Sequence, residues 1–139
     1  MGGRKKQYIP KSFESTGEPR DTSANIYESM LCSAAYQDLT KNQRLLYVYM
    51  KAQYYGKRKL GRDNPDIESL QGDDLFYFNL ALAVKYGLYA SGSRRQFYAD
   101  IKAVEDHGFI RTVSKGRGNH TRSIYQFTGG WKTWGSSRN

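Results

Sequence analysis

Cationic side chains are the residues of this chain whose types and spacing are best suited to chemistry. Between Ser91 and Arg122 the chain holds seven lysines and arginines against three aspartates and glutamates, a local net charge of +4. Guanidinium and ammonium groups bind phosphate oxygens, and an arginine can also donate two parallel hydrogen bonds to the edge of a guanine. We therefore expect this stretch to bind a polyanion, with duplex DNA as the leading candidate.

A helix must position most of these cations. Phe97, Ile101 and Val104 recur at i, i+4 and i+7, which predicts one apolar stripe facing a core. The opposite face is left for a partner, with Asp106 near its far end. Either Ser91 or Ser93 is expected to cap the start of the helix, and Gly108 to end it. The residues expected to contact DNA from this helix and its leading edge are Ser91, Ser93, Arg94, Arg95, Tyr98, Ala99 and Lys102.

A β-hairpin is predicted directly after this helix. Residues 109–113 and 123–127 alternate apolar and polar side chains, and the loop between them is rich in glycine and cations. Such a loop can follow a phosphate run or a groove of the duplex. The contacts expected from it are Lys115, Arg117, Asn119, His120 and Arg122. Upstream, Asn79 is expected to cap a short helix that ends at Gly87, and residues 89–92 to form the turn between the two helices.

The N-terminal half supplies packing elements. Residues 25–36 are expected to form one short helix, and Thr40 to cap a longer one over residues 41–55. The apolar stripe expected on the longer helix consists of Leu45, Val48, Tyr49 and Ala52, with Gly56 at its end. Residues 75–78 are aromatic and predict a third strand beside the hairpin. The predicted fold class is α+β, a winged helix-turn-helix with an extra N-terminal helix and a small antiparallel three-stranded sheet.

Two further basic segments lie outside these elements. Residues 1–24 are rich in glycine, serine and charge and are interpreted as a flexible basic arm, whereas residues 25–134 form the winged helix-turn-helix domain and residues 135–139 a C-terminal tail. Candidate DNA contacts in the arm and in the loop after residue 56 are Arg4, Lys5, Lys6, Lys57, Arg58 and Lys59. The alternative for both segments is charge that only keeps the surface solvated, and for the arm a partial expression remnant.

Residues suited to catalysis or metal binding are scarce. Cys32 is the single cysteine, while His107 stands at a helix end and His120 in the basic loop, neither with an evident partner. We therefore expect no catalytic residue, no metal site and no cofactor, and an enzyme is disfavoured. No apolar run approaches the roughly 20 residues that span a bilayer, and the N-terminus lacks the apolar core of a signal peptide. A cytoplasmic protein without a membrane partner is expected.

Length and charge agree with this interpretation. The chain of 139 residues suits one domain with a modest core, and its net charge of +9 concentrates polyanions around it. The chain resembles the winged helix-turn-helix proteins carried by plasmids, phages and integrative conjugative elements of Gram-positive bacteria. Four segments carry the resemblance: DLTKNQRLLYVYMKAQ, FYFNLALAVKYGLY, RRQFYADIKAVEDHGFIRTV and SIYQFTGGWKTW.

The resemblance covers roughly residues 26–134, and its most specific parts are the spacing of apolar residues from Phe97 to Ile110 and the pair Trp131 and Trp134 after the last strand. It implies sequence-specific binding of double-stranded DNA in replication initiation, transcriptional regulation or conjugative transfer of a mobile element. It also implies partners such as a relaxase, a replication protein or RNA polymerase.

Other binding functions remain open at this point. A winged helix can serve as a protein-protein interaction module in a nucleoprotein complex, with its charge incidental. An RNA-binding interpretation is weaker, because neither an RNP-like aromatic motif nor a GXXG clamp is present. A homodimer is left open, since helix-turn-helix proteins often bind two half-sites as dimers, although no heptad pattern marks an interface here.

Overall fold

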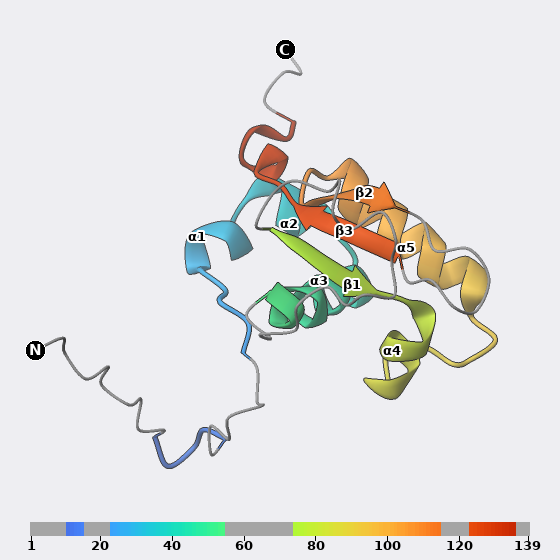
Figure 1. Ribbon diagram of the computed structural model, residues 1–139. Helices are drawn as coiled ribbons and strands as arrows, with labels where there is room; N and C mark the ends of the chain where they lie inside the picture. Colours follow the sequence, from blue (N-terminus) through green and yellow to red (C-terminus); the bar gives the residue numbers. More distant parts are fainter. Residues whose placement is uncertain (1–10, 16–22, 55–73, 115–122, 136–139) are drawn as a thin grey trace, which may run out of the picture.

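The computed structural model describes residues 11–15, 23–54, 74–114 and 123–135 and has an α+β fold (Figure 1). The elements follow one another as α1 (Glu28–Leu31), α2 (Ala34–Asp38), α3 (Lys41–Tyr54), β1 (Leu75–Phe78), α4 (Leu80–Lys85), α5 (Arg94–Asp106), β2 (Ile110–Ser114), β3 (Ser123–Phe127) and the 3-10 helix η2 (Gly130–Thr133). From α3 onward this is the predicted order of helices and strands. None of the helices in the described ranges is long and apolar enough to cross a membrane.

The three strands form one antiparallel sheet in the order β1-β3-β2. Phe78 pairs with Ser123 at the end next to the hairpin loop, and Ile110 pairs with Phe127 at the opposite end. A register shift between Thr112 and Ser114 marks a bulge in β2. The predicted hairpin and third strand are confirmed. These strands form there because alternating apolar residues and the aromatic run at 75–78 both favour a half-buried pleated surface.

One hydrophobic core lies between the sheet and the two longer helices. α3 packs against β1 and α5, and α5 also packs against β2. The largest fully buried side chains come from all of these elements and include Leu46, Met50, Phe78, Phe97 and Ile110. The core therefore fixes which face of α5 points away from the protein.

Glycines end both α4 and α5 in the same way. Gly87 and Gly108 have φ values of 79° and 88°, and each follows the last helical turn. After α5, the Phe109 N–H donates to the Val104 carbonyl and the Gly108 N–H to the Glu105 carbonyl, the Schellman pattern of a helix C-terminus. The prediction that Gly108 ends this helix is confirmed.

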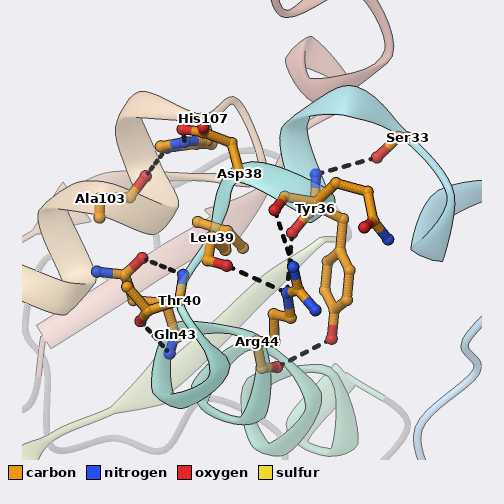
Figure 2. A network of polar contacts seen from close by, with 10 residues as sticks. Ser33, Tyr36, Asp38, Leu39, Thr40, Gln43, Arg44, Ala103 and His107 are labelled. Carbon is orange, nitrogen blue, oxygen red and sulfur yellow. Dashed lines mark hydrogen bonds and ion pairs between the residues drawn. The ribbon is translucent and has the colours of Figure 1, made fainter.

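The single helix predicted for residues 25–36 is wrong, since α1 and α2 are separate. Ser33 has an extended backbone, and its hydroxyl accepts a hydrogen bond from the Tyr36 N–H, so it caps α2 and interrupts the run. Arg44 of α3 then fixes the end of α2 by donating to the carbonyls of Tyr36, Gln37 and Leu39 (Figure 2). The predicted break at residues 38–40 is correct for α2.

The buried stripe predicted on α3 is also wrong, because the buried positions are shifted by about one residue along the helix. Thr40 and Gln43 exchange hydrogen bonds as a capping box, so the predicted start of the helix is right. The buried side chains, however, are Leu46, Tyr47, Met50 and Gln53, while Leu45 is 49% exposed. Both registers are apolar along α3, and the packing of α5 and β1 decides between them. The helix is described to Tyr54, so the predicted end at Gly56 lies outside the described residues.

Candidate nucleic-acid interface

The outward face of α5 is a cationic strip. Phe97, Ile101 and Val104 are buried, as their spacing predicted. The side chains predicted to point away from this stripe are exposed, and so are the two predicted to flank it; the former are Arg95, Ala99, Lys102 and Asp106, the latter Arg94 and Tyr98. We call this set without Asp106 the α5 face. Small Ala99 lies between the cations, so the helix backbone can approach a partner closely there.

The two arginines of the α5 face are in different situations. The Arg94 guanidinium carbon lies 5.6 Å from the centre of the Tyr98 ring, a cation-π contact that restrains both side chains. Arg95 makes no ion pair with any other residue in the described part of the chain. Arg94 and Tyr98 therefore act as a pair, whereas no aromatic ring in the described part of the chain restrains Arg95 in this way.

The charge of the α5 face is strongest at the start of the helix. Lys102 Nζ lies 3.5 Å from Asp106 Oδ2, one turn further along, and both side chains are exposed. Such exposed pairs contribute little to stability, but the carboxylate lowers the positive potential near Lys102. A polyanion is consequently attracted most to the N-terminal half of α5.

A groove runs between α5 and the hairpin. It has a volume of about 490 Å³ and extends from Arg94, Tyr98 and Lys102 on α5 to Thr112 and Ser123 on the two strands. Glu105 at its border is held by Thr112, whose N–H and hydroxyl donate to its carboxylate at 3.0 and 3.2 Å. Because its oxygens already accept these bonds, Glu105 fixes the helix to the strand. The groove is thus lined by cations, hydroxyl groups, aromatic rings and the aliphatic side chain of Ile101, together with the bound carboxylate of Glu105.

Neither of the two serines before α5 caps the helix with a side-chain hydrogen bond, although the sequence predicts such a cap from one of them. Ser93 occupies the N-cap position, but its side chain makes no capping hydrogen bond. Ser91 is exposed in the preceding turn and does not cap the helix. Ser93 is therefore the N-cap residue, as predicted, but the predicted capping hydrogen bond of its side chain is absent. Its hydroxyl is not used by the first turn of α5.

A buried carboxylate holds α5 in place, and the sequence pattern did not reveal it. Asp100 is 2% exposed, and its Oδ2 accepts a 2.6 Å hydrogen bond from the Tyr89 hydroxyl. Its Oδ1 accepts from Gln43 of α3 at 3.0 Å and from Gln96 at 2.9 Å. Burial, followed by the hydrogen bond to Asp100 and its charge, raises the pKa of Tyr89. Asp100 thus connects α3, the α4–α5 turn and α5.

His107 has partners, contrary to the expectation from the sequence. Its Nε2 lies 2.8 Å from Asp38 Oδ2 of α2, and its Nδ1 lies 2.7 Å from the Ala103 carbonyl (Figure 2). Its ring also stacks on Trp134, with ring centres 4.6 Å apart. Asp38 and Trp134 come from distant parts of the chain, so spacing alone could not reveal them. These contacts tie the end of α5 to α2 and to the segment after β3, which indicates a packing role.

The remaining predicted contacts lie outside the described residues. These are the hairpin-loop residues Lys115, Arg117, Asn119, His120 and Arg122, the arm residues Arg4, Lys5 and Lys6, and the loop residues Lys57, Arg58 and Lys59. Ser114 and Ser123 mark where the hairpin loop leaves and re-enters the sheet. Ser123 also lines the groove beside α5.

Together the fold and the α5 face define a class of site, a cationic helix beside a β-hairpin on an α+β scaffold. Comparison with known proteins adds no particular relative, since no family model, no curated protein and no solved structure matches the chain.

Proposed function

We propose that this protein is a winged helix-turn-helix protein that binds double-stranded DNA in a sequence-specific manner. In this proposal α4 and α5 are the helix-turn-helix, α5 is the recognition helix, and the β2–β3 hairpin is the wing. The observation that carries the proposal is the α5 face, which presents two cations and a small residue opposite the buried stripe and a third cation, Arg94, beside it. An α-helix with such a face fits the major groove of B-DNA.

In this proposal the side chains of the α5 face contact different parts of the duplex. Arg95 is suited to a guanine, whose O6 and N7 accept two parallel hydrogen bonds. The Arg94 and Tyr98 pair and Lys102 border the groove toward the hairpin, where one phosphate strand of the duplex can lie. Since Asp106 reduces the charge at the far end of α5, we propose that the helix enters the major groove with its N-terminus first.

From the resemblance of the sequence we also propose that this activity belongs to a mobile element of a Gram-positive bacterium. In that setting a sequence-specific DNA binder serves replication initiation, transcriptional regulation or conjugative transfer. The corresponding partners are a replication protein, RNA polymerase or a relaxase. These assignments rest on the resemblance, whereas the DNA-binding proposal rests on the α5 face.

Selection of binding sites from a random duplex library tests the proposal. Wild-type protein should enrich a consensus, and Arg95→Ala should lose preference at one base pair, by roughly 1–3 kcal/mol of discrimination, while keeping most of its affinity for random duplex. Lys132→Ala is the matched control, because this exposed cation lies on η2, at the end of the sheet away from the hairpin loop. It should return the wild-type consensus.

One outcome of this selection would favour the alternative function, protein-protein interaction. If Arg95→Ala changes neither the consensus nor the affinity, α5 does not read the duplex. The α5 face and the adjoining groove would then be the surface of a protein-protein interaction module in a nucleoprotein complex.

A further inference from the structure

A second hollow lies at the opposite end of the sheet from the hairpin loop. It has a volume of about 500 Å³ and is lined by α1 and the residues before it, α3, the residue before β1, the end of β3, and η2. Phe127 lines it and pairs with Ile110, whereas Ser123 at the other end of β3 leads into the hairpin loop. Figure 1 shows α1 and η2 at this end and the start of α5 at the other. The hollow is therefore separate from the proposed recognition surface.

The hollow combines aromatic rings with positive charge. Lys51 Nζ lies 5.4 Å from the centre of the Phe127 ring, and Lys132 Nζ lies 5.8 Å from the centre of the Trp131 ring. Both ammonium groups are thus held at aromatic walls. Among the described residues that line the hollow, Asp74 is the only acid.

An exposed aromatic ring completes the lining. Tyr27 is 67% exposed although it lines the hollow, and its backbone at the N-cap of α1 is extended. A large ring left in water is available to stack on another planar group. The amide of Asn25 and the hydroxyl of Ser29 line the same hollow and can donate or accept hydrogen bonds.

We propose that this hollow binds a nucleobase together with its phosphate. The base would stack on Tyr27 and present its polar edge to Asn25 and Ser29, while Lys51 and Lys132 would receive the phosphate. The volume is within the range of about 300–1,000 Å³ that is typical of small-ligand sites. The ligand is a free nucleotide or one unit of a single strand, because the bases of an intact duplex are stacked inside it and cannot enter.

An acidic peptide fits these observations less well. Its carboxylates could contact the two ammonium groups, but they would leave the exposed ring of Tyr27 without a planar partner. A nucleotide uses the ring and the cations together. The proposal does not depend on DNA recognition by α5, since the two sites share no residue.

Calorimetric titration of the full chain with adenosine monophosphate, and with a single-stranded oligonucleotide of roughly six nucleotides, tests the proposal. Both probes should bind, and a short duplex should not displace them. Tyr27→Ala should weaken binding by roughly five-fold to 100-fold through lost base stacking. Lys132→Gln should reduce the log-log salt slope for the oligonucleotide by about 0.7, the value per phosphate of a single strand.

The two probes also distinguish the sources of the ligand. Equal affinity for both supports a site for free nucleotides, and much tighter binding of the oligonucleotide supports a site for single strands. Lys41→Ala is the control, because Lys41 is an exposed cation at the start of α3 that lines neither the hollow nor the groove beside α5, and it should leave both titrations unchanged. Failure of both probes to bind, or affinities that Tyr27→Ala and Lys132→Gln do not alter, would overturn the proposal and favour an acidic peptide. Since Tyr27 and Lys132 are exposed, these substitutions remove no core contact.

Discussion

At the scale of single residues, Asp100 shows how a charge can be buried inside a small core. A buried carboxylate is tolerated only when its oxygens accept hydrogen bonds, and here three side chains donate to it. Two of the donors, Gln43 and Tyr89, come from outside α5. The orientation of the proposed recognition helix therefore depends on polar contacts as well as on its apolar stripe.

Removal of the shortest of these hydrogen bonds should measure that dependence. We expect Tyr89→Phe to lower the free energy of unfolding by roughly 1.5–3 kcal/mol, because the bond is donated to a charged group and Phe leaves the ring in place. Urea denaturation checks the value. Tyr27→Phe is the control, since this side chain is largely exposed and its hydroxyl should contribute little. A loss below about 0.5 kcal/mol for Tyr89→Phe would contradict this account of Asp100.

Buried tyrosines should make the fold sensitive to alkaline pH. Burial raises the pKa of Tyr125 from 10.0 to about 12, and burial also raises the pKa values of Tyr36, Tyr47 and Tyr89. Above pH 10 the unfolded chain loses these phenolic protons while the folded protein keeps them, so stability is present below pH 10 and lost above it. Tyr125 alone accounts for roughly 2–3 kcal/mol between its unfolded and folded pKa values.

Denaturation curves and phenolate absorbance together check this prediction. The free energy of unfolding should fall as the pH rises above 10, and the phenolate absorbance of native protein should lag behind that of unfolded protein. Tyr125→Phe should remove part of the pH dependence. Coincident titrations of native and unfolded protein would contradict it.

At the scale of elements, α5 could be predicted from the sequence because its signals agree. Phe97, Ile101 and Val104 form a single narrow stripe, and Gly108 ends the helix with the conformation that only glycine adopts easily. For α3, the sequence predicts the start of the helix correctly but the wrong face as the buried one. It carries apolar residues over much of its circumference, so sequence periodicity does not distinguish Leu45 from Leu46 as the buried residue.

Other features of the site depend on contacts between distant segments and could not be predicted. The partners of Asp100 and His107 lie 57 and 69 residues away, at Gln43 and Asp38. The separation of α1 from α2 depends on whether Ser33 caps a helix or lies inside one, and both roles are compatible with its neighbours. The exposed positions of α5 follow from local periodicity, whereas the network that fixes α5 follows from the tertiary fold.

The end of α5 provides a test at the element scale. We expect Gly108→Ala to destabilise the protein by about 2 kcal/mol or more, because an alanine is strained at a φ of 88° and its Cβ would lie 2.4 Å from the Trp131 nitrogen. Gly129→Ala is the matched control, since its Cβ would meet only the flexible end of Lys132 at 3.9 Å. Equal stability of the two variants in thermal denaturation would mean that η2 does not pack against the end of α5.

At the scale of the whole molecule, the proposed activities lie at opposite ends of one sheet. The start of α5, the end of β2 and the start of β3 lie at one end, and η2 and α1 lie at the other (Figure 1). His107 ties the C-terminal end of α5 to the end with η2, because it follows α5 and stacks on Trp134 next to η2. The proposed duplex site and the proposed nucleotide site share no residue, so the two proposals are compatible with each other.

Binding of the whole molecule to duplex DNA should depend steeply on salt. Each phosphate that a lysine or arginine neutralises contributes about −0.9 to the log-log slope of affinity against salt concentration, since counterions are released. We expect Lys102→Gln to make the slope for random duplex shallower by about 0.9, and Lys132→Gln to leave it unchanged. Asp106→Asn should strengthen binding only slightly if α5 enters the groove with its N-terminus first, and clearly if the helix lies flat. Fluorescence anisotropy at a series of salt concentrations measures all four proteins. An affinity that is flat between low and moderate salt would exclude a phosphate-bound duplex, whatever the consensus.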